Sequence, residues 1–182
     1  MNAALGLAAA AALVALLLWV MVSVPGESWR GALPPLREDE AALAERLKKH
    51  VATLAAGERN TRAPARLEAA ARYIEAELKG AGYRVRAQPY DSGDGIVRNL
   101  ESVREGRIAR SLVVGAHYDS VFGSPGANDN GSGVARRSSN SRAPWRRKPA
   151  RHTLRFVFFF ANEEPPYFAT AAMGSRASTP TS

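Results

Sequence analysis

The stretch that decides the fold reads Ser111-Leu112-Val113-Val114-Gly115-Ala116-His117-Tyr118-Asp119. Its first six residues form an uncharged run of the kind found in strands that are buried in a sheet. A second, largely apolar run covers residues 153–161 and is followed by Asn162-Glu163-Glu164. Between them lies a turn rich in Gly and Asn, Pro125-Gly126-Ala127-Asn128-Asp129-Asn130-Gly131-Ser132-Gly133. Chemically active side chains therefore follow apolar runs or a glycine-rich turn.

The segments before this stretch predict an α/β protein. Apolar residues recur at helical spacing over residues 38–56 and 64–79, and they alternate with polar residues over 83–90. A short strand is also expected at 96–100. Helices followed by strands that carry polar groups at their ends favour a sheet with a functional site at its carboxyl edge. We expect the runs 111–116 and 153–161 to be neighbouring strands that bring His117, Asp129 and Glu164 together.

The polar groups form the ligand set of a zinc hydrolase, which needs nitrogen and oxygen donors and a spare carboxylate for proton transfer. His117 and Asp119 project to the same face if the strand continues, so the carboxylate can orient the imidazole ring. Simpler interpretations stay open for each group. They are a core histidine beside a turn aspartate, an Asn/Gly turn, and an exposed acidic turn at Glu163 and Glu164.

The ordered set resembles the co-catalytic di-zinc aminopeptidases, zinc exopeptidases of the leucyl aminopeptidase and glutamate carboxypeptidase type. The resemblance implies the N-terminal part of a three-layer α/β/α fold with a mixed sheet, and a peptide substrate. It also implies two zinc ions, with His117, Asp129 and Glu164 as metal ligands and Asp129 as the bridge between the ions. Asp119 then orients His117, Glu163 acts as the general base, and the peptide bond after Asp129 is cis.

The chain departs from this family after Ala135. The family has an apolar helix there, whereas residues 136–147 are basic, lack an apolar face and contain Pro144. Plausible codons for these residues, read two bases later, encode an apolar helix, and the tail after Ser175 behaves in the same way. We therefore interpret 136–147 as out of frame and expect an exposed segment in place of the helix.

The resemblance also requires one further Asp and one further His beyond Glu164, and the sequence has neither. Each zinc then has two protein ligands, where catalytic zinc normally has three. We expect a truncated exopeptidase that is inactive as it stands. The alternative is a catalytically dead, membrane-tethered binding or scaffold protein.

Residues 1–25 predict a transmembrane anchor. No charged residue occurs from Ala3 to Val24, and these 22 residues span about 33 Å as a helix. A cleaved signal peptide is the main rival, although no basic residue precedes the apolar run. Residues 26–37 read as a linker and 38–182 as the incomplete peptidase domain. The family resemblance places that domain on the periplasmic or extracellular side.

Composition limits the remaining possibilities. Without cysteine the chain has no disulfide and no thiolate metal site. The net charge of +8 comes largely from seven basic residues between Arg136 and Arg151, so it does not indicate a nucleic-acid partner. His50, on the first predicted helix of the domain, is expected to face solvent. The sequence leaves the oligomeric state open.

Overall fold

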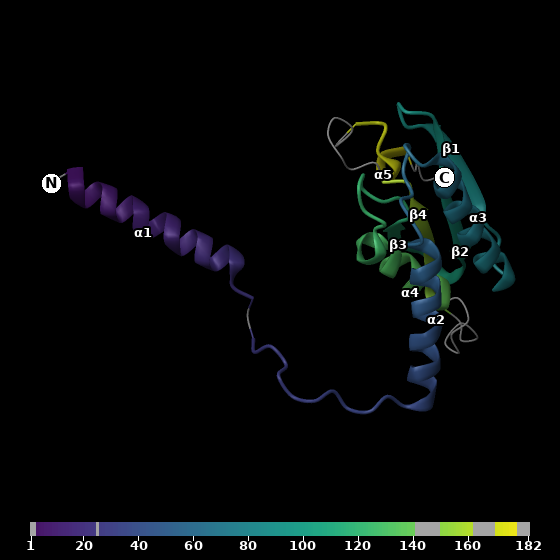
Figure 1. The fold of residues 1–182 in the computed structure, drawn as a ribbon, viewed down its shortest axis with the longest axis horizontal. Helices are drawn as coiled ribbons and strands as arrows, with labels where there is room; N and C mark the ends of the chain where they lie inside the picture. The colour runs from purple at the N-terminus through teal and green to yellow at the C-terminus, as the bar shows by residue number, and fades with distance from the viewer. Residues whose placement is uncertain (1–2, 25, 141–149, 162–169, 178–182) are drawn as a thin grey trace. The chain divides into compact units, whose positions relative to one another are not determined.

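The structure is a computed structural model that describes residues 3–24, 26–140, 150–161 and 170–177. The chain divides into two units, residues 1–35 and 36–182, which are considered separately. The first unit contains helix α1 (Ala3–Val22) (Figure 1). Residues 4–22 of α1 are long and apolar enough to cross a membrane, a property that signal sequences share.

The second unit is built on a four-stranded mixed sheet with the order β1-β2-β4-β3. The strands are β1 (Arg86–Asp91), β2 (Ile96–Arg104), β3 (Gly106–His117) and β4 (Ala150–Phe159). The pairs β1–β2 and β2–β4 are antiparallel, and β3 and β4 are parallel. The prediction that the two apolar runs are neighbouring strands is therefore confirmed, and His117 pairs with Phe159 at the carboxyl end of both.

Two long helices precede the sheet, α2 (Glu38–Leu54) and α3 (Pro64–Gly80). Three acidic residues lie in the first turn of α2, where the helix dipole favours them, and Pro64 occupies the first turn of α3, where its missing N–H costs nothing. Buried residues recur every three or four positions along α3: Leu67, Ala70, Ala71, Ile74 and Leu78. Both predicted helices are confirmed to within two residues.

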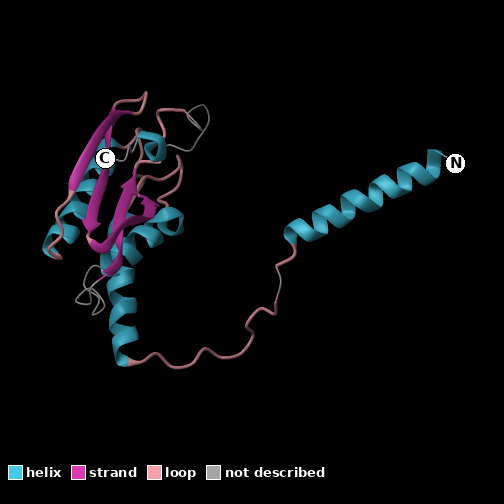
Figure 2. Ribbon diagram, turned by 180° about the vertical axis from the view of Figure 1, so that it is seen from behind, coloured by secondary structure: helices cyan, strands magenta, loops and turns pink. Residues whose placement is uncertain are grey.

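The hydrophobic core lies between these helices and one face of the sheet. Leu54 of α2 and Ile74 of α3 belong to one buried cluster with Leu100 of β2 and Phe158 of β4. Figure 2 shows the helices behind the sheet, which forms the adjoining layer. The predicted α/β class with a mixed sheet is confirmed.

Helix α4 (Gly133–Asn140) shows that the expected absence of a helix from residue 136 onward is wrong as far as Asn140, whereas Arg136 is exposed as expected. The helix follows the wide turn η1 (Ala127–Ser132), and its residues Val134 and Ala135 are fully buried. Helix α4 begins with these buried residues and continues to Asn140, although its sequence becomes polar after Ala135. Residues 141–149, with Pro144, lie outside the described residues, so the out-of-frame interpretation remains a prediction.

The expectation that His50 faces solvent is wrong. Only 8% of the residue is exposed, and its Nδ1 atom lies 2.6 Å from the Tyr73 hydroxyl. The helical pattern of α2 consists of aliphatic residues, but the face of α2 that contacts Tyr73 of α3 also carries this imidazole. His50 therefore belongs to the contact between α2 and α3.

Candidate metal site

The centre of the candidate site is the pair formed by His117 and Asp129. His117 is the last residue of β3, and its Nε2 atom lies 2.8 Å from Oδ1 of Asp129. Asp129 lies in η1, where its φ of −108° and ψ of 97° interrupt the helical geometry. Gly126, with a φ of +57°, starts this turn in the left-handed region that glycine adopts without cost. The turn thus returns Asp129 to the end of β3, and the Asp129–Asn130 peptide bond is cis.

Asp119 lies on the other side of the imidazole. Its Oδ1 atom is 3.3 Å from Nδ1 of His117 and accepts a hydrogen bond of 2.8 Å from the main-chain N–H of Ala161. Asp119 is buried, which fixes its carboxylate relative to both strands. The ring of His117 therefore lies between two carboxylates, with Asp129 at hydrogen-bonding distance from Nε2 and Asp119 near Nδ1.

This arrangement changes the acidity of the imidazole. Burial of the ring lowers the pKa of His117, but the carboxylates of Asp119 and Asp129 outweigh burial and raise this pKa to about 9. Without a metal, the protonated ring is favoured at neutral pH. A cation that binds at Nε2 takes the place of that proton.

The donors suit zinc, which binds imidazole nitrogen and carboxylate oxygen. The side chain of Asp129 is 86% exposed and that of His117 is 20% exposed, so the pair is open to solvent on the side of Asp129. Within the described ranges, no three His, Asp or Glu side chains form a group able to hold a metal ion. The predicted residues Glu163 and Glu164 fall in 162–169, outside the described residues.

Residues on either side of that segment, Ala161 and Gly174, are held at the carboxyl edge of β4. Ala161 is held by Asp119, as described above. Asn99 of β2, which is fully buried, donates a hydrogen bond of 2.8 Å to the carbonyl of Gly174 and accepts one of 3.1 Å from the N–H of Phe160. Gly174, the first residue of α5 (Gly174–Ala177), in turn donates to the carbonyl of Phe160 at 3.0 Å. Gly174 therefore lies beside the end of β4, the strand that neighbours His117.

Comparison with known proteins agrees with this geometry. Residues 96–180 match the family model of Peptidase family M28. All five predicted site residues lie within this match. The expectation of a zinc exopeptidase family is thus confirmed.

Individual proteins extend the likeness. The chain is 33% identical to leupeptin-inactivating enzyme 1 of Streptomyces exfoliatus over 134 residues, which are 71% of this chain and 29% of that protein. A Zn-dependent exopeptidase from Parabacteroides distasonis superposes with a TM-score of 0.53 at 23% identity, over 70% of this chain and 48% of that one. A glutaminyl cyclase from Macrostomum lignano gives a TM-score of 0.60 at 21% identity, over 82% and 50%.

The low identities and the partial coverage limit what these comparisons show. At such identities the two structures show the fold alone. The chain spans about a third of the length of the curated relatives that it matches. It therefore has the family's fold over its M28 segment, and the activity of the whole protein is a separate question.

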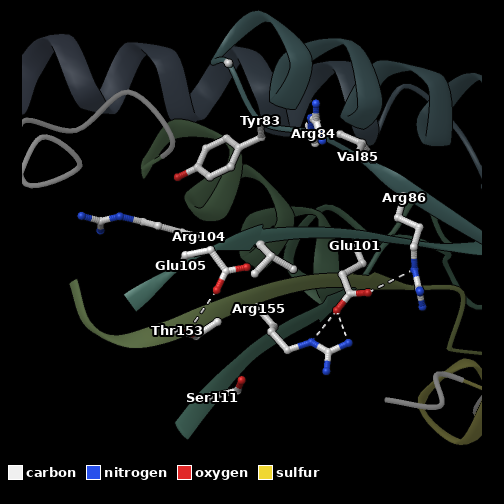
Figure 3. A pocket seen from close by; sticks show the side chains of 12 residues that line it. Tyr83, Arg84, Val85, Arg86, Glu101, Arg104, Glu105, Ser111, Thr153 and Arg155 are labelled. Atoms are coloured by element: carbon white, nitrogen blue, oxygen red, sulfur yellow. Dashed lines mark hydrogen bonds and ion pairs between the residues drawn. The ribbon is translucent and has the colours of Figure 1, made fainter. Parts of the chain in front are cut away.

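A large cavity of the second unit lies away from the candidate metal site. It measures about 960 Å³ and is lined by residues 82–86 and by parts of β2, β3 and β4, without His117 or Asp129 (Figure 3). Its polar centre is Glu101, which is 3% exposed and accepts hydrogen bonds from Arg155 at 2.5 Å and Gln88 at 3.0 Å. Since the buried carboxylate is already paired, this cluster is structural.

The sequence did not reveal one residue beside the candidate metal site, Arg59. It precedes the family match and lies in the loop between α2 and α3, yet it is 1% exposed and contacts the segments that carry His117 and Asp129. A single arginine between two helices normally indicates a solvated loop. The contacts cross about sixty positions of sequence, so no local pattern reveals them.

Proposed function

We propose that this chain carries the N-terminal part of a zinc-dependent exopeptidase that removes residues from the amino end of peptides. The observation that carries the proposal is the pairing of His117 Nε2 with Asp129 Oδ1 at 2.8 Å, with Asp119 behind the ring, inside an M28 segment. An ordinary turn would not place an exposed carboxylate, that of Asp129, against an imidazole whose other nitrogen faces a buried carboxylate, that of Asp119.

Four residues would hold two zinc ions or orient their ligands. His117 and Asp129 would bind one ion, and Asp129 and Glu164 the other, since one carboxylate has two oxygens. Asp119 keeps the imidazole oriented and raises its basicity. When bound, zinc supplies a Lewis acid that activates water and polarises the scissile carbonyl.

Glu163 is proposed as the general base. Its carboxylate takes a proton from the water as the water oxygen bonds to the scissile carbonyl carbon. It then delivers that proton to the amine nitrogen as the C–N bond breaks, so that neither free hydroxide nor an amide anion forms. Glu163 follows Ala161 by two positions, and Ala161 is fixed to Asp119. This attachment supports a base that works beside the His117 pair.

The same residues argue for low activity of the 182-residue chain. The named side chains give each zinc two protein ligands, fewer than the usual three of catalytic zinc. We expect weak zinc binding and little turnover. A membrane-tethered binding protein without catalysis is the alternative, and it predicts zinc or peptide binding with no hydrolysis at all.

A chelator-sensitive aminopeptidase assay tests the proposal. The chain is incubated with aminoacyl anilides and zinc, beside Glu163→Gln, Asp129→Asn and a control, Asp91→Asn, whose carboxylate holds the turn at Gly93. Weak turnover that is lost in the first two variants and kept in the third supports the exopeptidase. Zinc binding without turnover favours the binding protein, and failure to bind zinc contradicts the exopeptidase.

One further substrate separates the proposal from another activity. Since a glutaminyl cyclase shares the fold, the assay includes a peptide with an N-terminal glutamine. Release of the free amino acid agrees with an exopeptidase. Release of ammonia with cyclisation of the peptide would contradict the proposal.

We propose that α1 tethers the domain to a membrane, with the peptidase part on the periplasmic or extracellular side. The length and composition of α1 support a span. The side follows from the family resemblance, because no basic residue precedes the helix to set its orientation.

A further inference from the structure

Arg59 is a buried arginine whose guanidinium faces only main-chain carbonyls at hydrogen-bonding distance. Its Nε donates to Tyr118 at 2.7 Å, Nη1 to Leu54 at 2.9 Å and to Pro125, and Nη2 to Gly126 at 3.0 Å and Asp119 at 3.5 Å. A guanidinium has five N–H groups in a fixed plane, and here each has an acceptor. The side chain therefore joins three separate pieces of backbone.

Two of these pieces carry the candidate metal ligands. The carbonyls of Tyr118 and Asp119 directly follow His117, and those of Pro125 and Gly126 precede Asp129 by four and three positions. The carbonyl of Leu54 closes α2, which ties both loops to the helical layer. One planar group thus sets the spacing between the end of β3 and the start of η1.

The main chain of Arg59 strengthens the connection. Its N–H donates to the hydroxyl of Ser120 at 3.0 Å, and its carbonyl accepts from the N–H of Ser120 at 2.9 Å. The Gly126 carbonyl that Arg59 binds also accepts the N–H of Gly131 at 3.1 Å, which closes the turn around Asp129. A Cβ atom at Gly126 would lie 2.5 Å from the Asp129 carbonyl oxygen, so only glycine fits at this point of the turn.

The charge of Arg59 is tolerated because its hydrogen bonds are complete. Burial of a cation costs free energy unless it is fully hydrogen-bonded, and an apolar side chain at this place would leave the five carbonyls without their donor. Burial lowers the pKa of Arg59, and the charge of Asp119 opposes this effect. What an apolar residue cannot do is to hold five carbonyls in fixed directions.

We propose that Arg59 is the positioning residue of the metal site, which sets the His117 and Asp129 loops at the separation that a shared ion requires. The zinc part of this inference rests on the proposed function, and the part about the loops does not. Arg59 touches no reacting atom in this role. It acts through the backbone of residues 118–119 and 125–126.

The first test uses the unmodified 182-residue chain in detergent micelles without metal. Nuclear magnetic resonance should detect separate, slowly exchanging guanidinium N–H signals for Arg59, and slow exchange for the amides of Ser120 and Gly131. A single averaged, rapidly exchanging signal for the Arg59 guanidinium would overturn the inference without any substitution.

The second test compares Arg59→Met and Arg59→Lys with Leu78→Ala. Leu78 is a buried residue of α3 outside both loops, so its truncation serves as the control for a general loss of stability. Arg59→Met should speed amide exchange at Ser120 and Gly131 at least tenfold more than at Phe158 of β4, and weaken zinc binding by about tenfold or more. Lysine keeps the charge but has three donors, so its effects should be intermediate.

The outcomes separate the two proposals. Arg59→Met and Leu78→Ala are compared at temperatures equally far below their own melting temperatures. If both change loop exchange and zinc affinity alike, Arg59 is an ordinary core residue and the inference fails. If the unmodified chain binds no zinc, the proposed function fails, and the exchange measurements still decide the role of Arg59. If Arg59→Met does not fold, Arg59→Lys and the guanidinium signals decide it.

Discussion

The carboxylate of Asp119 accepts a hydrogen bond of 2.8 Å from the main-chain N–H of Ala161. These residues follow β3 and β4, two parallel strands whose carboxyl ends meet at one edge of the sheet. The same oxygen lies 3.3 Å from Nδ1 of His117. One buried atom therefore connects the metal-ligand side of the site to the strand that leads to Glu163 and Glu164.

Replacement of Asp119 by asparagine should weaken zinc binding. The amide has nearly the same size, but it lacks the charge that favours a basic, correctly oriented imidazole. Loss of such a supporting group typically lowers metal affinity by about 10–100-fold. Competition between the purified chain and a chromophoric zinc chelator measures the change. The exposed substitution Asp91→Asn is the control, and equal affinities of Asp119→Asn and the unmodified chain would contradict this role.

Zinc binding should become tighter as the pH rises toward 9. The pKa of His117 is raised to about 9 in the metal-free site, so zinc must displace a proton at neutral pH. Because the folded pKa lies above the ordinary value of 6.5, the ion pairs of His117 stabilise the fold fully below about pH 6.5. This stabilisation is lost as the pH rises through 9.

A titration of the His117 ring signals by nuclear magnetic resonance measures this pKa directly. Calorimetry in two buffers counts the proton released with zinc, and about one is expected near neutral pH. Asp129→Asn should lower the pKa, because it removes one of the two carboxylates. A His117 pKa at or below 6.5 in the unmodified chain would contradict the prediction.

Much of the sheet could be predicted because its strands are local patterns. The uncharged run before His117 and the phenylalanine-rich run of β4 show their burial in composition, and parallel neighbours place their carboxyl ends together. The glycine-rich turn at Asp129 has an equally local cause, since Gly126 supplies the left-handed residue that it needs.

The residues that the sequence did not reveal are polar groups buried by distant partners. Arg59 binds carbonyls about sixty positions away, and His50 meets Tyr73 across two helices. Charge and polarity predict exposure unless the partner is known, and the partner is set by tertiary packing. Helix α4 shows the opposite effect, because burial of Val134 and Ala135 starts a helix that its later residues do not favour.

The apolar helix α1 should remain attached to the mature chain and hold it on a membrane. Its 19 apolar residues from 4 to 22 reach about 28 Å, close to the thickness of a bilayer core. The chain should stay in the membrane fraction after an alkaline carbonate wash, and deletion of residues 3–24 should release it. A mature N-terminus beyond residue 20, determined by mass spectrometry, would identify a cleaved signal peptide instead.

Glu101→Gln should destabilise the fold and leave zinc affinity unchanged. The buried carboxylate of Glu101 lies 2.5 Å from Nε and Nη2 of Arg155 and 3.5 Å from Nε of Arg86. Without it the charge of Arg155, whose side chain is only 21% exposed, lacks its counter-charge. Breaking a buried pair in this way costs about 3–5 kcal/mol. Chemical denaturation should show this decrease in the free energy of unfolding. The lower value is expected because the side chains of Arg155 and Arg86 both keep some contact with solvent.

Two further variants separate the charge effect from packing. Glu105→Gln, on an exposed residue that lines the same cavity, should change stability by less than about 0.5 kcal/mol. Combining Glu101→Leu with Arg155→Met removes the charges of the buried pair and should recover part of the loss. The remaining partner, Arg86, is exposed and keeps its contact with solvent. Since His117 and Asp129 do not line this cavity, zinc affinity should stay within about twofold in every variant that folds. A large loss of zinc affinity in Glu101→Gln at temperatures where it is folded would show that the cavity and the metal site are coupled.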